Sequence, residues 1–392
     1  MQLLTLNTGS SSVKAALYRG ERGEERTIAI RAERIGLADA QFRITAADGT
    51  TLLDEQRDFP DHAVALDALF SWLAEVQPDL ALDAVGHRLV HGGRRYRDPQ
   101  RITAAMVAAL RELVSIDPEH LPQALAAIEA VTKKYPQLLQ IACFDTAFHQ
   151  RMPAVAQLYP LPREYRDDGL IRYGFHGLSY EYIMATLRDI DPDAAAGRII
   201  IAHLGSGASM VAVRDGVGHD TTMGFTPTGG LMMGTRTGDL DPGVLLYLLT
   251  KHGLDAAALG TLVNKHSGLL GVSGTSGDMR DLLDRAATDP QARMAIDLFC
   301  YTARKNVGAL AAVLGGVDTL IFTGGIGERA APVREAICTE LAYLGVTLDA
   351  ERNAAHAAII SRVAGAVTVR VLPTDEDLVI ARHTTRIISR KE

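Results

Sequence analysis

Two similar hairpins stand half a chain length apart in these 392 residues, and this spacing constrains the fold more than any other feature. Each hairpin places a glycine-rich turn between two apolar strands; the strands are residues 2–7, 13–18, 198–204 and 209–213, and the turns are Gly9–Ser12 and Gly205–Ala208. When the two hairpins are aligned, Gly9 matches Gly205 and Gly20 matches Gly216. We interpret the match as an internal duplication of one α/β domain. Two unrelated hairpins are the alternative, because glycine and serine are common in all turns.

The rest of each half alternates between helix and strand patterns. Leu66, Leu69, Phe70 and Leu73 keep the spacing of one helical face. Further helices are predicted at about 102–114, 121–134 and 291–314, and further strands at 138–144, 319–322 and 367–372. This alternation predicts two duplicated α/β domains with open sheets, which bind ligands beyond the carboxyl ends of their strands.

The length also favours two domains, because a single hydrophobic core rarely serves so many residues. We expect the helical pattern after Pro373–Glu376 to pack back on the first domain. The first domain is therefore predicted to comprise residues 1–149 and 376–392, and the second residues 150–375. A discontinuous domain of this kind predicts an interdomain cleft that can close.

Composition excludes several classes of function. The net charge is -7, without a basic tract, which disfavours a nucleic acid partner. Cys143, Cys300 and Cys338 stand far apart in apolar stretches, which predicts buried free thiols in a reducing compartment. The chain begins directly with a strand pattern and has no uninterrupted apolar run of about 18 residues. We therefore expect a cytoplasmic protein that does not enter a membrane.

Three glycine-containing loops follow predicted strands: Asn7–Ser12, His203–Gly207 and Thr323–Glu328. Backbone N–H groups in such turns, and at the helix start predicted after Thr323, are suited to bind phosphate. A P-loop motif is absent, which disfavours the P-loop ATPases. The loops indicate a site for a phosphorylated ligand of another class.

Cationic side chains occur beside several glycines. Arg88 lies in a strand pattern bounded by glycines, and Arg236 lies in a glycine-rich loop. We expect these two arginines to hold a carboxylate and a γ-phosphate, the alternative being that each bridges carboxylates of its own domain. Glycines around His176 favour a ligand-facing imidazole, whereas His120 has weaker support.

Two acidic residues are candidates for a metal site. Asp145 directly follows the strand 138–144, and its alternative role is a helix N-cap. Glu376 precedes the last helix, where a glutamate also complements the helix dipole. One or two carboxylates with waters and substrate phosphates suffice for Mg²⁺. No histidine and cysteine cluster has zinc-like spacing.

Taken together, these segments resemble the acetate kinases, within the acetate and sugar kinase, Hsc70 and actin superfamily. The matching segments, in chain order, are Asn7–Lys14, Gly86–Gly93, Phe144–His149, Tyr173–Gly177, Met223–Pro227, Gly234–Pro242 and Pro373–Glu376. The resemblance implies two actin-like (ribonuclease H-like) domains and a homodimer. It also implies reversible in-line transfer of the γ-phosphoryl group of ATP to a short-chain carboxylate such as acetate, with Mg²⁺ or alternatively Mn²⁺.

The resemblance implies roles for individual residues. Asn7 and Glu376 resemble metal-site residues. The catalytic residues it implies are Asp145, His176, Arg236, Arg88 and His120. The substrate-binding residues are Arg88, Val90, Phe175 and Pro227, of which the last three would line a pocket for the acyl methyl group. The nucleotide-binding residues are Lys14, His203, Leu204, Gly205, Ser206, Gly207, Asp278, Met279, Arg280, Gly325, Ile326, Gly327, Glu328 and Arg329.

Some positions depart from the family pattern: Glu119, Leu121, Leu178, Ser206 and Arg329. Glu119 is the most consequential, because the family typically has an apolar residue there, near the acyl pocket. A carboxylate would repel an anionic substrate unless it faced solvent or a cation. Two alternatives follow: a kinase for propionate, butyrate or another small acid, and an actin-like or chaperone-like ATPase. The second lacks support, because no separate peptide-binding domain remains beside the two lobes.

Overall fold

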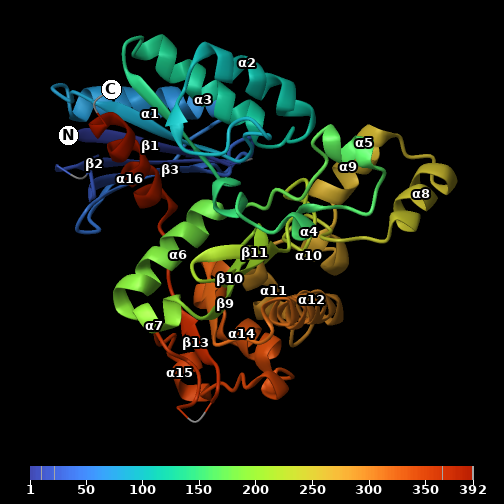
Figure 1. Cartoon of the computed structure of the whole chain (residues 1–392). Helices are drawn as coiled ribbons and strands as arrows, with labels where there is room; N and C mark the ends of the chain where they lie inside the picture. The colour runs from blue at the N-terminus through green and yellow to red at the C-terminus, as the bar shows by residue number, and fades with distance from the viewer. Residues whose placement is uncertain (10, 22, 364, 391–392) are drawn as a thin grey trace. The chain divides into compact units, whose positions relative to one another are not determined.

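A computed structural model describes residues 1–9, 11–21, 23–363 and 365–390. The chain divides into two compact units (Figure 1). Unit 1 comprises Met1–Ala147 and Asp375–Glu392, and unit 2 comprises Phe148–Thr374. Ser10, which belongs to the predicted turn Gly9–Ser12, lies outside the described residues.

Unit 1 is built on an eight-stranded sheet with the order β5-β4-β3-β2-β1-β6-β8-β7. Its strands are β1 (Gln2–Thr8), β2 (Ser12–Arg19), β3 (Glu25–Glu33), β4 (Gln41–Ala46), β5 (Thr51–Gln56), β6 (Ala84–Leu89), β7 (Gln100–Arg101) and β8 (Leu139–Phe144). Strand β1 pairs antiparallel with β2 and parallel with β6, which in turn pairs parallel with β8. The carboxyl ends of β1, β6 and β8 therefore lie at one edge of the sheet.

Unit 2 is built on a five-stranded sheet with the order β11-β10-β9-β12-β13. Its strands are β9 (Arg198–Leu204), β10 (Ala208–Arg214), β11 (Val217–Thr221), β12 (Thr319–Thr323) and β13 (Thr368–Val371). Strand β9 pairs antiparallel with β10 and parallel with β12, which pairs parallel with β13.

The two sheets share one topology. The order β3-β2-β1-β6-β8 in unit 1 corresponds to β11-β10-β9-β12-β13 in unit 2, with the same antiparallel and parallel pairings. The predicted α/β fold with two duplicated domains is confirmed. In unit 1 the sheet is extended by β4 and β5 at one edge and by β7 at the other.

The helices of unit 1 are α1 (His62–Val76), α2 (Ala104–Glu112), α3 (Leu121–Lys134) and α16 (Glu376–Ser389). The predicted apolar face of α1 is buried in the core against β2–β4. Helix α16 packs against β1 and β6. A Cβ on Gly86 of β6 would lie 2.3 Å from Thr384 Oγ1 and 2.5 Å from Ile380 Cγ2. The glycine therefore allows α16 to lie close to the sheet.

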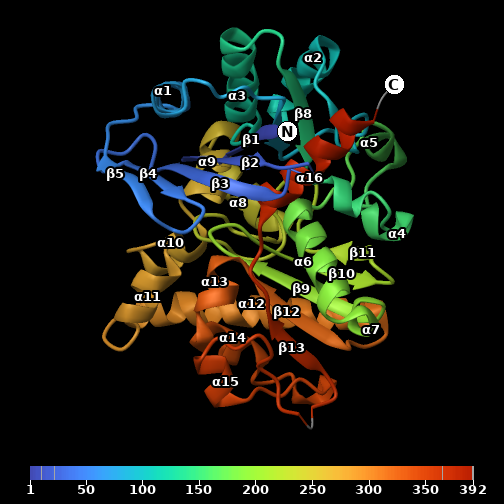
Figure 2. The ribbon, with the colours of Figure 1, turned by 90° about the vertical axis from the view of Figure 1, so that its left-hand side faces the viewer.

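The helices of unit 2 are α4 (Ala154–Gln157), α5 (Arg163–Asp167), α6 (Gly177–Ile190), α7 (Pro192–Ala195), α8 (Pro242–Lys251), α9 (Ala256–Lys265), α10 (Gly268–Ser273), α11 (Met279–Arg285), α12 (Pro290–Leu314), α13 (Gly324–Arg329), α14 (Ala331–Cys338) and α15 (Ala350–Ala354). Short 3-10 helices occur in both units: η1 (Leu113–Ser115) in unit 1, η2 (Ala147–His149) where the chain passes from unit 1 to unit 2, and η3 (Ala342–Leu344) in unit 2. Helix α12 packs on β9–β11. Helix α6 lies against the sheet that contains β9 and β10 (Figure 2). Ile183 and Leu187 of this helix pack in one buried cluster with Ile199 and Val211 of the sheet.

Cys143, Cys300 and Cys338 are buried, and none of them is in a disulfide. Among the described residues, no helix has both the length and the apolar character needed to cross a membrane.

Candidate active site

The carboxyl edge of the unit 1 sheet gathers four of the predicted site residues. Asn7 lies near the end of β1, Arg88 lies near the end of β6, and Asp145 follows β8. Glu376 is the first residue of α16, the helix that packs on β1 and β6. Three parallel neighbours and one helix start therefore place these side chains together, in the region where open α/β sheets bind ligands.

Arg88 is the centre of this cluster. Its Nη2 donates to Asp145 Oδ2 at 2.6 Å, and its Nε donates to both Asp145 oxygens at 3.1 Å. Nη1 donates to Asn7 Oδ1 at 3.0 Å, and Asn7 Nδ2 donates to Glu376 Oε2 at 3.2 Å. Arg88 thus bridges carboxylates of its own unit, which was the alternative role given by the sequence. A guanidinium has five N–H groups, so these bonds leave donors for an incoming anion.

The cluster is buried, and burial and charge act against each other. The side chain of Asp145 is 1% exposed and that of Arg88 is 14% exposed. Burial lowers the pKa of Arg88, but the charges of Asp145 and Glu376 outweigh it and raise the pKa overall, so Arg88 stays charged. Burial raises the pKa of Asp145, and the Arg88 guanidinium opposes this rise. Two carboxylates share one guanidinium, so the cluster favours a further cation.

The oxygen atoms of this cluster suit a hard divalent cation. Mg²⁺ prefers carboxylate and amide oxygens, and it commonly keeps waters and substrate phosphates as further ligands. Within the described part of the chain, no group of three or more His, Cys, Asp or Glu side chains is arranged to hold a metal. Asn7, Asp145 and Glu376 therefore fit a Mg²⁺ ion that is shared with a phosphate ligand, and they do not form a protein-only cage.

His120 is placed by an aspartate that the sequence analysis missed. Asp117 Oδ1 lies 2.8 Å from His120 Nδ1, and both residues are buried at the start of α3. The charge of His120 acts on Asp145 to lower its pKa, so His120 lies near the cluster. An acid three residues before a histidine was the signal in the sequence, because a turn at a helix start brings the two side chains together.

Three other residues of unit 1 bear on the predictions. Val90 is buried just beyond β6. Lys14 is exposed on β2. Burial raises the pKa of Asp377 to about 6, and the charge of Lys14 opposes this rise. Glu119 is half-buried beside His120.

In unit 2, His176 occupies a strained position just before α6. Its backbone is left-handed, with φ 58° and ψ 23°. Such a conformation costs a residue other than glycine on the order of 1–3 kcal/mol and is concentrated at functional sites. The preceding segment is held by buried His149, whose Nε2 donates to the Phe175 carbonyl at 2.9 Å. Gly174 allows this contact, because a Cβ there would lie 2.6 Å from the His149 ring.

His176 and His203 stack with 4.3 Å between ring centroids and 22° between ring planes. Ser209 Oγ lies 2.8 Å from His176 Nδ1, and Ser179 Oγ lies 2.8 Å from His203 Nδ1. A Cβ at Gly207 would lie 3.3 Å from His176 Nε2, and one at Gly205 would lie 4.0 Å from His203 Nε2. Both Nε2 atoms therefore lie beside the glycine turn that follows β9. Two positive charges about 4 Å apart repel by about 4 kcal/mol at an effective dielectric constant of about 20, so the stack disfavours two charged rings.

Arg236 reaches the same turn. Its Nη1 would lie 3.9 Å from a Cβ at Gly207, and Nη1 donates to the Pro227 carbonyl at 3.0 Å. The backbone N–H of Gly234 donates to the Ser206 carbonyl at 3.1 Å. Arg236 and its loop are thus attached to the turn after β9 and to the segment that carries Pro227.

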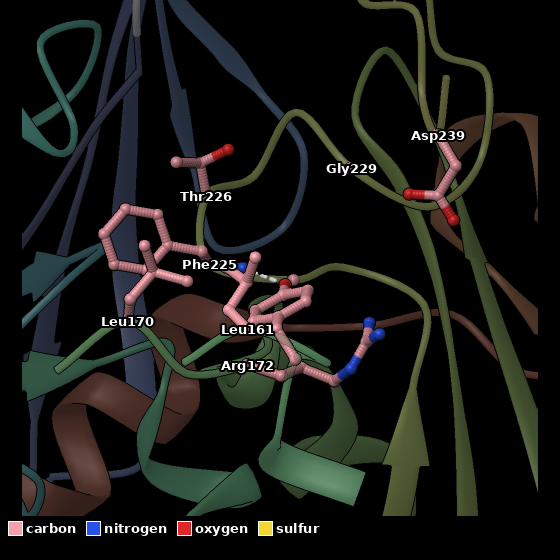
Figure 3. Close-up of a pocket in the computed structure, with 9 residues that line it drawn as sticks. Leu161, Leu170, Arg172, Phe225, Thr226, Gly229 and Asp239 are labelled. Carbon is pink, nitrogen blue, oxygen red and sulfur yellow. Dashed lines mark hydrogen bonds between the residues drawn. The ribbon is translucent and has the colours of Figure 1, made fainter. Parts of the chain in front are cut away.

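Arg172 and Tyr159 hold the segment before Pro227, and Figure 3 shows Arg172 and Phe225 of this region. Arg172 Nη1 donates to the carbonyls of Thr221 and Thr222 at 3.1 Å, and the Phe225 N–H donates to Tyr159 Oη at 2.8 Å. A pocket of about 310 Å³ lies here. It is lined by Tyr159, Leu161, Leu170, Arg172, Gly224, Phe225, Thr226, Gly229 and Asp239. Neither His176 nor Arg236 lines this pocket. The pocket therefore lies outside the part of the site that these two residues form.

The predicted nucleotide-binding segments of unit 2 lie near one another. Strands β9 and β12 are parallel neighbours, so His203–Gly207 and Gly325–Arg329 follow adjacent strand ends. Gly324 has a left-handed backbone (φ 77°), and a Cβ there would lie 2.7 Å from the Leu204 carbonyl oxygen. A Cβ on Gly277 would lie 2.9 Å from the Gly234 carbonyl oxygen, so Asp278–Arg280 adjoins the Arg236 loop. Asp278 caps α11 and accepts from the Arg280 N–H.

Comparisons with known proteins identify the family of this chain. Residues 2–382 match the Acetokinase family. The chain belongs to the acetokinase family. An acetate kinase of Rhodopseudomonas palustris (strain TIE-1) is 48% identical over 391 residues, which cover 98% of each chain.

Two solved acetokinase-like structures have the same fold as this chain. The Porphyromonas gingivalis acetate kinase has a TM-score of 0.86 and 39% identity, over 99% of this chain and 100% of that one. A propionate kinase from Francisella tularensis has a TM-score of 0.91 and 34% identity, over 98% of this chain and 99% of that one. The resemblance to acetate kinases and the enzyme class, a kinase, are confirmed.

In this acetokinase, the residues that the sequence analysis missed are those that orient others. They are Asp117 for His120, Ser209 and Tyr180 for His176, Ser179 for His203, and His149 for the Phe175 backbone. Asp117 and Ser179 stand close in sequence to predicted site residues, and proximity was their only signal. Tyr180 was hidden, because a tyrosine at helical spacing in an apolar segment is typical of a core residue.

Proposed function

We propose that this acetokinase transfers the γ-phosphoryl group of ATP to acetate, reversibly giving acetyl phosphate and ADP. The observation that carries the proposal is the buried cluster of Arg88, Asp145 and Glu376 in a chain whose relatives, matched along nearly their whole length, are named acetate kinases. A guanidinium held among carboxylates stays charged, and its remaining N–H groups are suited to a small carboxylate.

In this proposal, unit 1 binds the acyl substrate. Arg88 donates to the acetate carboxylate, which it orients for in-line attack on phosphorus. Asn7, Asp145 and Glu376 would hold Mg²⁺, which when bound neutralises charge on the nucleotide phosphates. Glu376 and Asn7 are hydrogen-bonded to each other, and Asp145 is fixed by Arg88, so the oxygen donors are positioned in advance. His120, oriented by Asp117, supplies a further polar group near Asp145.

Unit 2 binds the nucleotide and meets the migrating phosphoryl group. The turn 203–207 and the segments 278–280 and 325–329 supply backbone and side-chain contacts, with Lys14 of unit 1 as a phosphate contact. His176 and Arg236 donate to the equatorial oxygens, where charge develops during transfer. Little covalent chemistry is required of the protein, because phosphoryl transfer depends mainly on position and charge.

Acetate is the substrate that the names of the relatives favour, and propionate is the second candidate. Both an acetate kinase and a propionate kinase have high TM-scores to this chain, so the fold does not separate the two acids. Val90, Phe175 and Pro227 are proposed to contact the acyl chain. Apolar contact is worth only about 1 kcal/mol per methylene, so we expect weak discrimination between neighbouring acids. Butyrate should be a poorer substrate than either.

One assay tests the proposal. The purified chain is incubated with ATP, Mg²⁺ and a panel of acetate, propionate and butyrate, and acyl phosphate is trapped with hydroxylamine. We expect the fastest trapping with acetate and a slower rate with propionate. If no acid gives a trapped product, the proposal is wrong. Steady ATP hydrolysis without any carboxylate would instead support the actin-like or chaperone-like ATPase.

We also propose a homodimer in the cytoplasm. Every residue of α8, all of which the structure describes, is at least partly exposed, although the helix is mostly apolar. Val244, Leu246 and Tyr247 are 44%, 62% and 57% exposed. A second copy that covers this face would remove its apolar surface from water. Three cysteines without a disulfide also fit a reducing compartment.

Light scattering with size-exclusion chromatography tests the dimer. We expect a dimer for the wild type and a monomer for Leu246→Asp with Tyr247→Glu, because two carboxylates would have to be buried in the interface. Tyr343→Glu is the matched control, since Tyr343 is 75% exposed and lies outside α8. A dimer in the double variant would place the interface elsewhere.

A further inference from the structure

We infer that Ser209 and Tyr180 fix the tautomer of His176, so that a neutral imidazole presents its Nε2–H to the transferred phosphoryl group. The inference rests on the proposed function, and it makes Ser209 and Tyr180 positioning residues for that reaction. It is carried by a continuous buried hydrogen-bonded chain that ends at a histidine with a strained backbone.

The chain runs from Tyr180 Oη to Ser209 Oγ and from there to His176 Nδ1. Ser209 lies on β10 and Tyr180 on α6, and both side chains are completely buried. Tyr180 belongs to the apolar cluster by which α6 packs on β9 and β10. The core of unit 2 therefore fixes the positions of both hydroxyl groups.

Proton bookkeeping gives the chain a direction. A serine hydroxyl has one proton, so it can donate to only one of its two partners. A phenol is the stronger donor of the two hydroxyls, because its ring withdraws electron density from oxygen. With Tyr180 donating to Ser209, the Ser209 proton is directed to His176 Nδ1. A nitrogen that accepts has no proton of its own, so the neutral ring carries its proton on Nε2.

The Nε2 atom faces the glycine turn after β9. A Cβ at Gly207 would lie 3.3 Å from this atom and 3.9 Å from Arg236 Nη1, so an imidazole donor and a guanidinium donor are directed to the same turn. His203 stacks on His176 and has its own serine contact, from Ser179. Neutral rings avoid the repulsion of two adjacent cations beside Arg236. Arg236 then supplies the positive charge at this site, and His176 supplies an oriented hydrogen-bond donor.

The reverse chain has a different consequence. If His176 Nδ1 donated to Ser209, and Ser209 donated to Tyr180, neutral His176 would have a lone pair on Nε2. That lone pair would face the phosphoryl oxygens and repel them. The two arrangements have the same heavy-atom geometry, and they differ in which ring nitrogen is protonated.

Nitrogen NMR on the full chain separates the two arrangements. The protein is labelled with ¹⁵N-histidine, and the His176 signals are assigned by their loss in His176→Gln. At neutral pH we expect an unprotonated Nδ1 and a protonated Nε2. A protonated Nδ1 with an unprotonated Nε2 in the wild type would overturn the inference. This measurement does not depend on catalysis, so it is decisive even if the substrate proposal fails.

Kinetics give a second readout. Tyr180→Phe removes the donor at the start of the chain and keeps the ring. We expect kcat to fall about tenfold with KM for ATP little changed, since the lost orientation matters at the transition state. The His176 signals should show a mixture of tautomers. Ser209→Ala should lower kcat further, because it removes the direct partner of Nδ1.

The matched control is Tyr182→Phe, which removes a phenol from a half-buried tyrosine of the same helix outside this chain. It should leave kcat and the His176 tautomer unchanged. If Tyr180→Phe behaves like this control in both readouts, Tyr180 has a packing role only and the inference is wrong. If the wild type gave no trapped acyl phosphate, the proposed function would be wrong. The NMR result would still decide which nitrogen of His176 is protonated.

Discussion

Unit 1 and unit 2 place their predicted site residues at the same edge of the same strand order, yet with different chemistry. In unit 1, Arg88 donates to buried Asp145, and its Nε lies 3.9 Å from Glu376 Oε2. In unit 2, His176 is fixed by hydroxyl groups, and Arg236 contacts a backbone carbonyl. The comparison teaches that a duplicated scaffold can supply the location of a site, while local burial decides whether charges or neutral hydrogen bonds hold it.

The two solutions have different energetic consequences. A buried ion pair is costly to break, because the remaining charge is left without compensation. A neutral hydrogen-bonded residue costs less to remove. Mutation of Arg88 in unit 1 should therefore change stability and turnover together, whereas mutation of His176 or Arg236 in unit 2 should change turnover more than stability.

Arg88→Met should have the largest effect. We expect turnover to fall on the order of 10³ or more, since the carboxylate donor is lost. The free energy of unfolding should fall by about 3–5 kcal/mol, because buried Asp145 loses the guanidinium with which it pairs. Hydroxylamine trapping and urea unfolding measure the two effects.

Two controls accompany this change. Arg43→Met breaks an exposed pair with Asp54 and should cost less than about 1 kcal/mol. The double variant Arg88→Met with Asp145→Asn should regain part of the lost stability without regaining turnover. If the double variant is less stable than Arg88→Met, the uncompensated charge is not the cause.

Buried histidines should make stability depend on pH in both units. Burial lowers the pKa of His87 and His91 in unit 1 and of His149 in unit 2, in each case to about 4. Between pH 6.5 and 4 the unfolded chain takes up protons that the folded chain does not. Stability should therefore fall as the pH falls through this window, by about 3 kcal/mol per histidine.

Urea unfolding of the wild type and of His149→Gln at several pH values measures how much His149, the unit 2 histidine, contributes to the pH dependence of stability. The variant should be less stable at neutral pH, because it loses the ordinary contacts of the ring. Its stability should nevertheless change less with pH than that of the wild type. Equal slopes for the two proteins would show that His149 is protonated in the folded state as readily as in the unfolded state.

Arg236→Ala and His176→Ala should each lower turnover on the order of 10² or more, with smaller changes in ATP binding. Arg236→Ala should lower the unfolding free energy less than Arg88→Met does, since Arg236 donates to the backbone carbonyl of Pro227, whereas Arg88 pairs with buried Asp145. Arg293→Ala, at an exposed position on α12, is the control and should be silent. Near-normal turnover in both site variants would mean that the active site is elsewhere.

Much of the scaffold was predictable because strand and helix patterns are local. The predicted strands at 138–144 and 319–322 agree with β8 and β12, and the helix at 291–314 agrees with α12. The predicted helix at 102–114 is instead α2 followed by a 3-10 turn. Strands β4 and β5 were missed because they bury few residues: β4 buries only Phe42 and Ile44, and the edge strand β5 has no buried residue at all.

The candidate site was predictable where strand ends determine it. Asn7, Arg88 and Asp145 each stand at the end of a strand, so the parallel order brings them together. The contact between Tyr180 and Ser209 was not predictable, because it depends on how a helix packs on a sheet. Likewise, the partners of Arg88 were left open by the sequence, since the same arginine would suit a structural bridge or a ligand contact.

The smallest predicted effect concerns the acyl chain, where Val90 of unit 1 is compared with Phe175 of unit 2. Val90→Ala removes apolar contact and makes room for a longer acid. We expect kcat/KM for propionate relative to acetate to rise about fivefold, equivalent to about 1 kcal/mol. Phe175→Leu should in addition lower kcat for both acids, because the Phe175 ring is buried directly before His176 and a smaller side chain would loosen the packing there.

Competition assays with both acids measure these ratios, and Val114→Ala, at a half-buried position in the unit 1 core, controls for a general loss of packing. An unchanged ratio in Val90→Ala would remove Val90 from the acyl pocket. A changed ratio in Phe175→Leu without loss of kcat would mean that this side chain selects the substrate and does not support His176. The contrast between the two units would then fail at this position, because both would act through apolar contact alone.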